Sequence, residues 1–239
     1  MLYLMGLGLN ERSLTRESFE ILSRCKRIYL ENYTVDFPYT TYQLEEIVGK
    51  KIIEANREKV ESLEIVDEAK KMDVALLIYG SPLMATTHIS LIQEAKYLGI
   101  KCKVLYNASI FDAIGETGLQ LYKFGKVTSM PAWKKSFRPT SFMEIIKENF
   151  SINAHSLILA DIGLEFSDAL KQLKEASEEH NFKIKKLIVC QTLGTKNSKI
   201  FYRSIKEFEE FTGVRKPYCI IIPSEKLHEV EREFLKLFE

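Results

Sequence analysis

Short apolar runs alternate along the chain with longer segments in which apolar residues recur at helical spacing. The clearest run is Val74–Tyr79, whose continuous apolar character is typical of a strand covered on both faces. Just before it, Glu58–Lys71 repeats apolar residues three positions apart from Val60 to Ala69, which predicts a helix. The pattern therefore indicates strands and helices that follow one another.

The same pattern extends over the whole chain. Strands are predicted at the apolar start LYLMGLG and at Arg27–Leu30, Lys51–Glu54, Val74–Tyr79, Lys101–Tyr106, Val127–Met130, Ser156–Ala160, Lys186–Cys190 and Tyr218–Ile222. Helices are predicted at Thr15–Arg24, Leu44–Val48, Glu58–Lys71, Thr86–Leu98, Ser109–Leu119, Met143–Asn149, Ser167–Glu179, Ile200–Phe211 and Glu225–Phe238. Alternating strands and helices are joined by right-handed crossovers, so we expect an α/β fold with mainly parallel sheets.

One segment interrupts the alternation and suggests where the chain divides. Lys123–Pro139 contains Gly125, Pro131 and Pro139 around a single short predicted strand. A chain of 239 residues has room for one or two domains of about 150 residues. We therefore expect an N-terminal α/β domain over residues 1–125 and a C-terminal α/β domain over residues 126–239.

The balance of charged residues limits the kinds of molecule that this chain is expected to bind. The 34 Lys and Arg residues are offset by 33 Asp and Glu residues, for a net charge of +1. No strong field exists to gather nucleic acid or an anionic membrane, although a local basic patch or an acidic protein partner stays open. No apolar run reaches the ~18 residues of a membrane-spanning helix. The start MLYLMGLGLNERS also lacks the basic region of a signal peptide.

Cysteine and histidine usage points away from a metal site. Cys25, Cys102, Cys190 and Cys219 show no C-x-x-C spacing, and the four histidines are scattered as well. Most of the cysteines lie in or beside apolar runs, where a thiol behaves as a small core residue. We expect no disulfide framework, no bound metal, and a reducing, cytoplasmic compartment.

Turns of small residues follow three of the predicted strands. Gly6-Leu-Gly8 follows the first strand, Gly80–Leu83 the most apolar one, and Asn107–Ile110 the next along the chain. Ligands of open α/β sheets bind outside the carboxyl ends of the strands, so these turns together indicate a small-molecule site. The first turn is not a dinucleotide fingerprint, because Glu11 stands where a third glycine would be. For each turn, a tight loop or a helix cap without any ligand remains the alternative.

Isolated titratable residues give weaker signals. His88 and His228 have no partner at a spacing that predicts a catalytic triad, and surface or helix-cap roles are favoured for both. Asp161 and Glu165 follow a strand end, where a carboxylate serves either as a general acid or base or as a cap.

A basic and aromatic segment lies in the interrupting stretch. Trp133 is followed by Lys134, Lys135 and Arg138, a group suited to a phosphate or to an acidic face of a partner. A solvated loop is the alternative and is slightly favoured by composition.

Blocks spread over most of the chain resemble those of the diphthine synthases, the S-adenosylmethionine-dependent methyltransferases of diphthamide biosynthesis. The blocks that carry the resemblance are Met1–Leu9, Glu31–Thr34, Arg57–Glu61, Gly80–His88, Asn107–Ile110, Gly118–Gly125 and Arg138–Ser141. The most specific are G-x-P-x-x-A-T-T-H and G-L-x-x-Y-K-F-G, and the order and spacing of all the blocks agree with the family.

The resemblance implies a fold and a reaction. The fold is that of the tetrapyrrole methyltransferases, in which two α/β domains hold S-adenosyl-L-methionine in the cleft between them and release S-adenosyl-L-homocysteine. Family members are homodimers. Their substrate is a modified histidine of translation elongation factor 2 that carries a 3-amino-3-carboxypropyl group. The archaeal type trimethylates the amine, whereas the eukaryotic type also methylates the carboxylate.

The resemblance also carries the family's cofactor contacts onto this chain. They fall on Leu9, Ser81, Met84, Ser109, Ile110, Ala160, Leu193 and Cys219. Three positions depart from the family pattern: Ser81 replaces an acidic residue, Thr192 an arginine and Cys219 a histidine. We expect many contacts to come from main-chain groups, which tolerate a change of side chain.

The departures keep other functions in view. One alternative is a divergent, non-catalytic paralogue that binds only the cofactor or the elongation factor. Another is a methyltransferase of the same fold that acts on a tetrapyrrole or on RNA, although the near-neutral charge disfavours RNA. No catalytic base is assigned, and Asp161 is the first candidate for orienting the acceptor amine.

Overall fold

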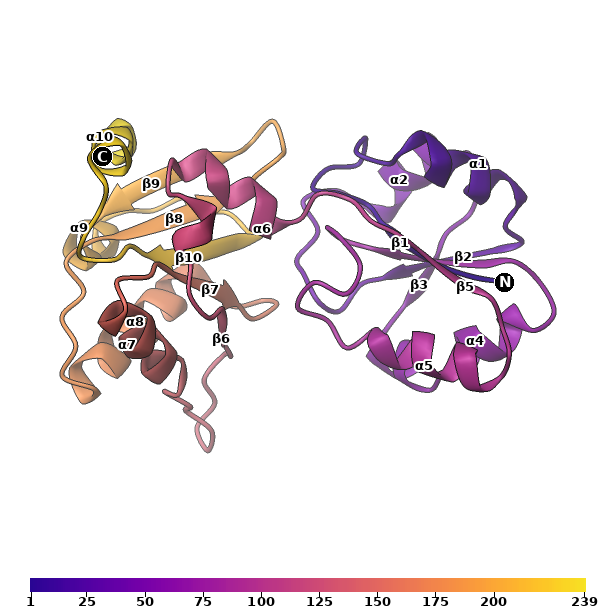
Figure 1. Ribbon diagram of the computed structural model, residues 1–239, viewed down its shortest axis with the longest axis horizontal. Helices are drawn as coiled ribbons and strands as arrows, with labels where there is room; N and C mark the ends of the chain where they lie inside the picture. Colours follow the sequence, from indigo (N-terminus) through magenta and orange to yellow (C-terminus); the bar gives the residue numbers. More distant parts are fainter. The chain divides into compact units, whose positions relative to one another are not determined.

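The computed structural model describes residues 1–239 and divides the chain into two units, residues 1–111 and 112–239 (Figure 1). Each unit contains one five-stranded sheet. The sequence placed the border after residue 125, whereas residues 112–125 pack with the second unit. None of the helices has both the length and the apolar character needed to cross a bilayer.

The first unit is built on a fully parallel sheet. Its strands are β1 (Leu2–Gly6), β2 (Arg27–Glu31), β3 (Ile53–Ala55), β4 (Val74–Ile78) and β5 (Cys102–Leu105). They are arranged in the order β3-β2-β4-β1-β5, and every neighbouring pair is parallel. The central strands β1 and β4 are buried along their whole length, as the apolar run at Val74–Tyr79 predicts.

Helices cover both faces of this sheet (Figure 1). They are α1 (Arg16–Arg24), α2 (Thr41–Val48), α3 (Arg57–Glu61), α4 (Glu64–Ala69), α5 (Ile89–Tyr97) and, across the border of the units, α6 (Ile110–Ala113). On one face α1 and α2 pack on Ala75 and Leu77 of β4, and on the other α4 and α5 pack on Leu76 and its neighbours. Alternate side chains along β4 therefore belong to two separate cores.

The predicted helix Glu58–Lys71 is wrong as a single element. Leu63 adopts a left-handed backbone with φ of 64°, and this break separates α3 from α4. The apolar spacing continues across the break, since Val60 and Val66 both enter the same core. Periodicity alone therefore could not reveal it.

The second unit contains a mixed sheet. Its strands are β6 (Thr128–Met130), β7 (Ser156–Ala160), β8 (Leu187–Gln191), β9 (Lys199–Arg203) and β10 (Tyr218–Ile222). In the order β6-β7-β10-β8-β9, only β6 and β7 are parallel, and the other three pairings are antiparallel. The α/β class is thus confirmed, and the mainly parallel arrangement holds for the first sheet but not for the second.

The remaining elements are helical. The α-helices are α7 (Phe142–Ser151), α8 (Phe166–Glu179), α9 (Ile205–Glu209) and α10 (Glu229–Leu235). The 3-10 turns are η1 (Ile114–Thr117), η2 (Leu121–Lys123) and η3 (Lys236–Phe238). The predicted helix Ser109–Leu119 is therefore one turn of α-helix, α6, that tightens into η1.

The predicted helix Ile200–Phe211 is wrong over its first part. Residues Lys199–Arg203 form strand β9, which pairs with β8 at the outside of the sheet. The helix begins only after Ser204, whose side chain accepts a hydrogen bond from the N–H of Glu207 while the Glu207 carboxylate accepts from the N–H of Ser204. This capping box, visible in the sequence as S-x-x-E, was the signal that separated strand from helix.

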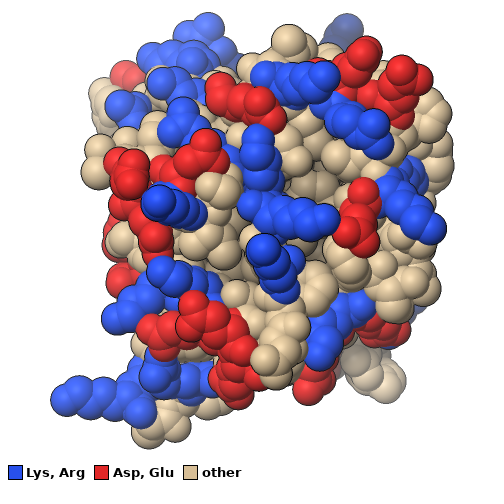
Figure 2. All heavy atoms as spheres, turned by 90° about the vertical axis from the view of Figure 1, so that its left-hand side faces the viewer, with Lys and Arg blue, Asp and Glu red and all other residues tan.

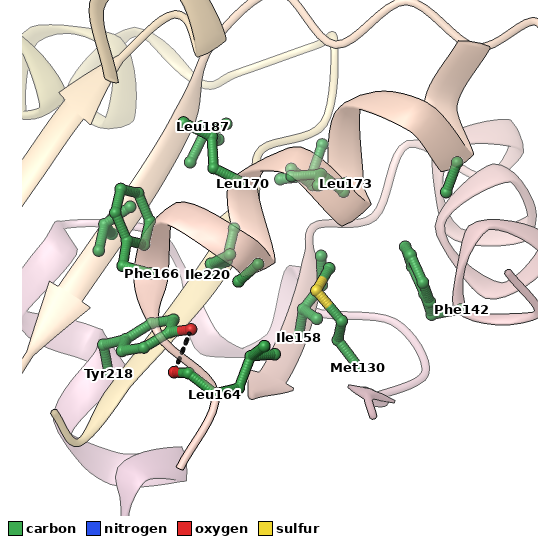
Figure 3. Close-up of a cluster of buried hydrophobic side chains, with 14 of the residues drawn as sticks. Met130, Phe142, Ile158, Leu164, Phe166, Leu170, Leu173, Leu187, Tyr218 and Ile220 are labelled. Carbon is green, nitrogen blue, oxygen red and sulfur yellow. Dashed lines mark hydrogen bonds between the residues drawn. The ribbon is translucent and has the colours of Figure 1, made fainter. Parts of the chain in front are cut away.

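A single apolar core holds the second unit together (Figure 3). Helix α8 contributes Phe166, Leu170 and Leu173, which pack with residues of the sheet such as Ile158 and Ile220. The Tyr218 hydroxyl donates to the Leu164 carbonyl at 3.0 Å, which fixes the loop that enters α8.

A buried ionic network joins α10 to the beginning of the second unit. The Glu231 carboxylate is fully buried and accepts from the N–H groups of Gln120 and His228 at 3.0 and 2.8 Å. It also pairs with Lys123 and with His155 Nε2. Burial by itself raises the pKa of Glu231, but these hydrogen bonds outweigh it and hold the pKa at about 2.

Candidate active site

Three loops leave the carboxyl ends of neighbouring strands β4, β1 and β5 in the first unit. The connections that follow β1 and β4 run to opposite faces of the sheet, because α1 packs in one core and α5 in the other. This reversal between adjacent strands is the place where open α/β sheets bind ligands. The three small-residue turns of the sequence are the beginnings of these loops.

The first two loops are joined directly through their main chains. The N–H of Gly8 donates to the Gly80 carbonyl at 3.0 Å, and the N–H of Gly80 donates back to Gly8 at 2.9 Å. A Cβ on Gly6 would stand 2.6 Å from the Gly80 carbonyl oxygen, closer than real contacts allow. The glycines are therefore explained by this close approach.

Asn107 connects the third loop to the other two. Its side-chain amide donates to the carbonyls of Gly6 and Ser13 at 3.1 and 2.9 Å. Its own N–H donates to Ser81 Oγ at 3.4 Å. Asn107 lies in a predicted motif, but this linking role was not predicted; its position directly after a strand among small residues was the available signal.

The predicted contacts of the first unit lie on these three loops. Leu9, Ser81 and Ser109 are buried, and Ile110 is half-buried. Met84 is 42% exposed, in a loop where Leu83 and Ala85 adopt left-handed backbones with φ of 69° and 54°. Such strain in residues other than glycine is frequent at ligand sites.

His88 does not take the surface or helix-cap role that was predicted for it. It is 1% exposed and makes no side-chain cap, so neither a surface role nor a cap role holds. Its Nε2 lies 3.5 Å from the Tyr33 hydroxyl, and its Nδ1 has no partner, nor does the buried Thr86 Oγ1. Burial lowers the pKa of His88 from 6.5 to about 4, so the ring is neutral at physiological pH.

The predicted contacts of the second unit also come together, at one end of its sheet. Cys219 pairs in register with Leu159 on one side and with Cys190 on the other. Ala160 follows Leu159 at the end of β7, and Leu193 lies just beyond the end of β8. The chain therefore gathers Ala160, Leu193 and Cys219 although they are far apart in sequence.

The two departures in this unit are built into the local structure. Thr192 has φ of 45°, and its hydroxyl donates to the Asn197 carbonyl at 2.8 Å, which closes the turn after β8. The hydrogen bond between the Cys219 and Cys190 thiols, together with burial, raises the pKa of Cys190 well above its ordinary value. Cys190 is thus an unreactive core thiol, and Cys219 is buried beside it.

The other candidates take structural positions. The Asp161 carboxylate accepts from the N–H groups of Ala132 and Ile162 at 3.1 and 3.0 Å, so it stabilises the turn after β7. The His228 side chain caps α10 by accepting from the N–H of Val230, which confirms the cap role favoured for it. Glu165 pairs with Lys216 at 2.7 Å on the surface.

Comparison with known proteins decides the family. The family model for tetrapyrrole (corrin/porphyrin) methylases matches residues 1–209. The diphthine methyl ester synthase of Schizosaccharomyces pombe is 35% identical over all of this chain and 94% of its own length. The diphthine synthase of Methanocaldococcus jannaschii is 37% identical over 99% of this chain and 98% of its own length.

This chain belongs to the diphthine synthase family. A crystal structure of a diphthine synthase superposes with a TM-score of 0.91 at 26% identity, covering 100% of this chain and 96% of the other. Both sheets of the present structure are thus part of the family fold, including the mixed second sheet. This member of the diphthine synthase family is accordingly a methyltransferase.

Proposed function

We propose that this chain transfers methyl groups from S-adenosyl-L-methionine to the modified histidine of translation elongation factor 2 in diphthamide biosynthesis. The observation that carries the proposal is the match of the whole chain, rather than one domain, to diphthine synthases of both eukaryotic and archaeal origin. A non-catalytic paralogue, or a methyltransferase for a tetrapyrrole or RNA, is not favoured by these relatives.

The loop after β4 has the groups needed to bind a nucleoside through main-chain atoms. The N–H groups of Leu83, Ala85 and Thr86 donate no hydrogen bond within the chain. Thr86 Oγ1 and His88 Nδ1 are buried without a partner. Buried polar atoms are normally satisfied, so orphans in a strained loop support a ligand that completes them.

The predicted cofactor contacts are proposed accordingly. In the first unit Leu9, Ser81, Met84, Ser109 and Ile110 would hold the cofactor. In the second unit the contacts would be Ala160, Leu193 and Cys219. Cys219 offers a thiol where the family has a histidine, and the Ser81 hydroxyl is a weaker acceptor than a carboxylate. The expectation that the cofactor lies between two domains stays a prediction.

The chain needs to supply alignment more than covalent chemistry. When bound, S-adenosylmethionine supplies a methyl group that is already activated on a positively charged sulfur. The protein must exclude water and align the acceptor with this group, which is the proximity contribution to rate. An amine acceptor must also be neutral. We propose that Asp161, whose oxygens retain unused lone pairs beside their two main-chain donors, orients that amine.

The test uses the full chain and its proposed protein substrate. Elongation factor 2 carrying the unmethylated intermediate is incubated with labelled S-adenosylmethionine, and the modified peptide is weighed by mass spectrometry. Transfer of label supports the enzyme, and the mass increment counts the methyl groups. Absence of label on the factor, with cofactor bound normally in calorimetry, would contradict the proposed function. Unchanged turnover in Asp161→Asn would exclude the role of Asp161 alone.

We also propose that two chains associate into a homodimer and that the protein is cytoplasmic, in keeping with the family resemblance. Sedimentation velocity of the purified chain measures the first of these.

A further inference from the structure

A hollow of about 650 Å³ opens in the second unit between the loop 132–138 and the first half of α8. The loop follows β6 in Figure 1. It contains the basic and aromatic residues that the sequence analysis singled out and that the methyl-transfer site does not use.

The loop is held in one conformation by buried and half-buried groups. Gln172 of α8 is 4% exposed, accepts from the N–H of Trp133 at 2.8 Å, and donates to the Pro131 carbonyl at 3.1 Å. The Trp133 indole N–H donates to the Pro139 carbonyl at 3.0 Å, which closes the other end of the loop. The segment is therefore a fixed platform rather than a free surface loop.

The tip of this platform carries positive charge that the chain does not neutralise. The main chains of Lys134 and Phe137 exchange two hydrogen bonds of 2.9 and 3.1 Å, which makes a tight hairpin. The side chains of Lys134 and Lys135 are exposed and form no ion pair. Phe137 beside them is 56% exposed. By contrast, Arg138 is occupied, since it stacks 4.2 Å from the Trp133 ring and pairs with Glu175.

The platform is attached to the end of the sheet that holds the proposed second-unit contacts. The N–H of Ala132 donates to the Asp161 carboxylate, and the N–H of Asp161 donates to the Met130 carbonyl at 3.0 Å. Met130 pairs in register with Ala160. A protein bound at the tip would thus be held next to the strand end that carries Ala160 and Asp161.

The surroundings favour a carboxylate-bearing partner over a polyanion. The hollow behind the tip is lined by charges of both signs, Glu165 and Asp168 as well as Lys171, so the unpaired positive charge is confined to the two lysines of the tip and is too small an area for a continuous phosphate backbone. Figure 2 shows basic side chains with acidic ones around them over one face of the molecule. A segment with a few carboxylates and an apolar side chain fits two lysines next to an exposed phenylalanine.

We propose that Lys134, Lys135 and Phe137 form a docking surface for an acidic segment of the protein substrate. This inference rests on the proposed function for the identity of the partner, elongation factor 2. The docking surface acts on encounter and binding and takes no part in methyl transfer itself.

The test is charge reversal at the tip in the full chain. The double variant K134E/K135E is compared with K96E/K101E, a control that reverses two exposed lysines without ion pairs in the first unit. Affinity for elongation factor 2 is measured by surface plasmon resonance at 50 and 300 mM salt, without turnover. We expect K134E/K135E to weaken binding by about tenfold or more at low salt, and the control to match wild type.

Further readouts separate docking from the other possibilities. Under turnover, K134E/K135E should raise KM for the factor while kcat and calorimetric affinity for S-adenosylmethionine stay unchanged. Phe137→Ala, which keeps the charge, should weaken binding by about fivefold. Wild-type affinity in K134E/K135E would overturn the inference. So would a loss of affinity confined to a single-stranded RNA probe. If wild type binds the factor but transfers no methyl group, the proposed function fails while the docking surface stands.

Discussion

Ser81 places a neutral hydroxyl where the family motif carries a carboxylate. Its Oγ is buried and accepts only the 3.4 Å hydrogen bond from the Asn107 N–H. This is the position at which a single side chain should change cofactor affinity most.

Ser81→Asp is expected to tighten the binding of S-adenosylmethionine by about tenfold to a hundredfold. A carboxylate makes stronger, charge-assisted bonds to ribose hydroxyls, worth ~1–3 kcal/mol. Calorimetry on the full chain measures the change. Ser81→Asn has the same shape without the charge and should show no such gain; equal affinities for the two variants would contradict the expectation.

His88 should make the protein less stable in mild acid. Its folded pKa of about 4 lies below the unfolded value of 6.5, so the unfolded chain takes up the proton first. The contribution of the neutral ring to the free energy of unfolding is complete above pH 6.5 and is lost as the pH falls toward 4, by up to about 3 kcal/mol. Urea denaturation from pH 7 to pH 4 measures the slope. In His88→Gln that slope should be shallower, whereas His180→Gln should retain it.

At the scale of elements, the Glu231 network ties α10 to residues before β6. Glu231→Ala should lower the free energy of unfolding by about 3–5 kcal/mol, because it leaves two main-chain N–H groups without an acceptor and removes the carboxylate that pairs with Lys123. Glu233→Ala, an exposed change on the same helix, should have little effect. Chemical denaturation compares the two, and similar losses would count against the network.

Most elements could be predicted because the spacing of apolar residues along the chain indicates which positions are buried. The strands Ser156–Ala160 and Tyr218–Ile222 were predicted at their observed bounds, since each is a short apolar run between polar segments. The relative direction of the strands in the second sheet could not be predicted, because a run of apolar residues looks the same in parallel and antiparallel pairings. The break at Leu63 was hidden for a related reason, since Leu63 is itself apolar and the apolar spacing continues on both sides of it.

The candidate site was predictable only in part. Small residues after strands identified the three loops of the first unit, because close main-chain approach restricts residue type there. His88 was misjudged, since burial of a histidine depends on packing from Tyr33 and other distant segments. The pairing of Cys190 with Cys219 likewise depends on strand order, which no local pattern encodes.

At the scale of the whole molecule, each unit has its own cores and should fold separately. Residues 1–111 expressed alone are expected to unfold cooperatively in urea, as monitored by circular dichroism. For the second unit, the fragment 112–239 should be more stable than 126–239, which lacks Lys123 and the Gln120 N–H that satisfy Glu231. Equal stabilities would instead favour a border after residue 125.

The outermost strands have a consequence for self-association. β3 and β6 are three residues long, β5 carries Lys103, and β9 begins with Lys199 and ends with Arg203. Short edge strands and basic side chains make it difficult for a strand of another molecule to pair with the sheet. This protects against fibril growth. Copies of this chain that assemble would therefore meet through side chains, and neither sheet would continue from one copy into the next.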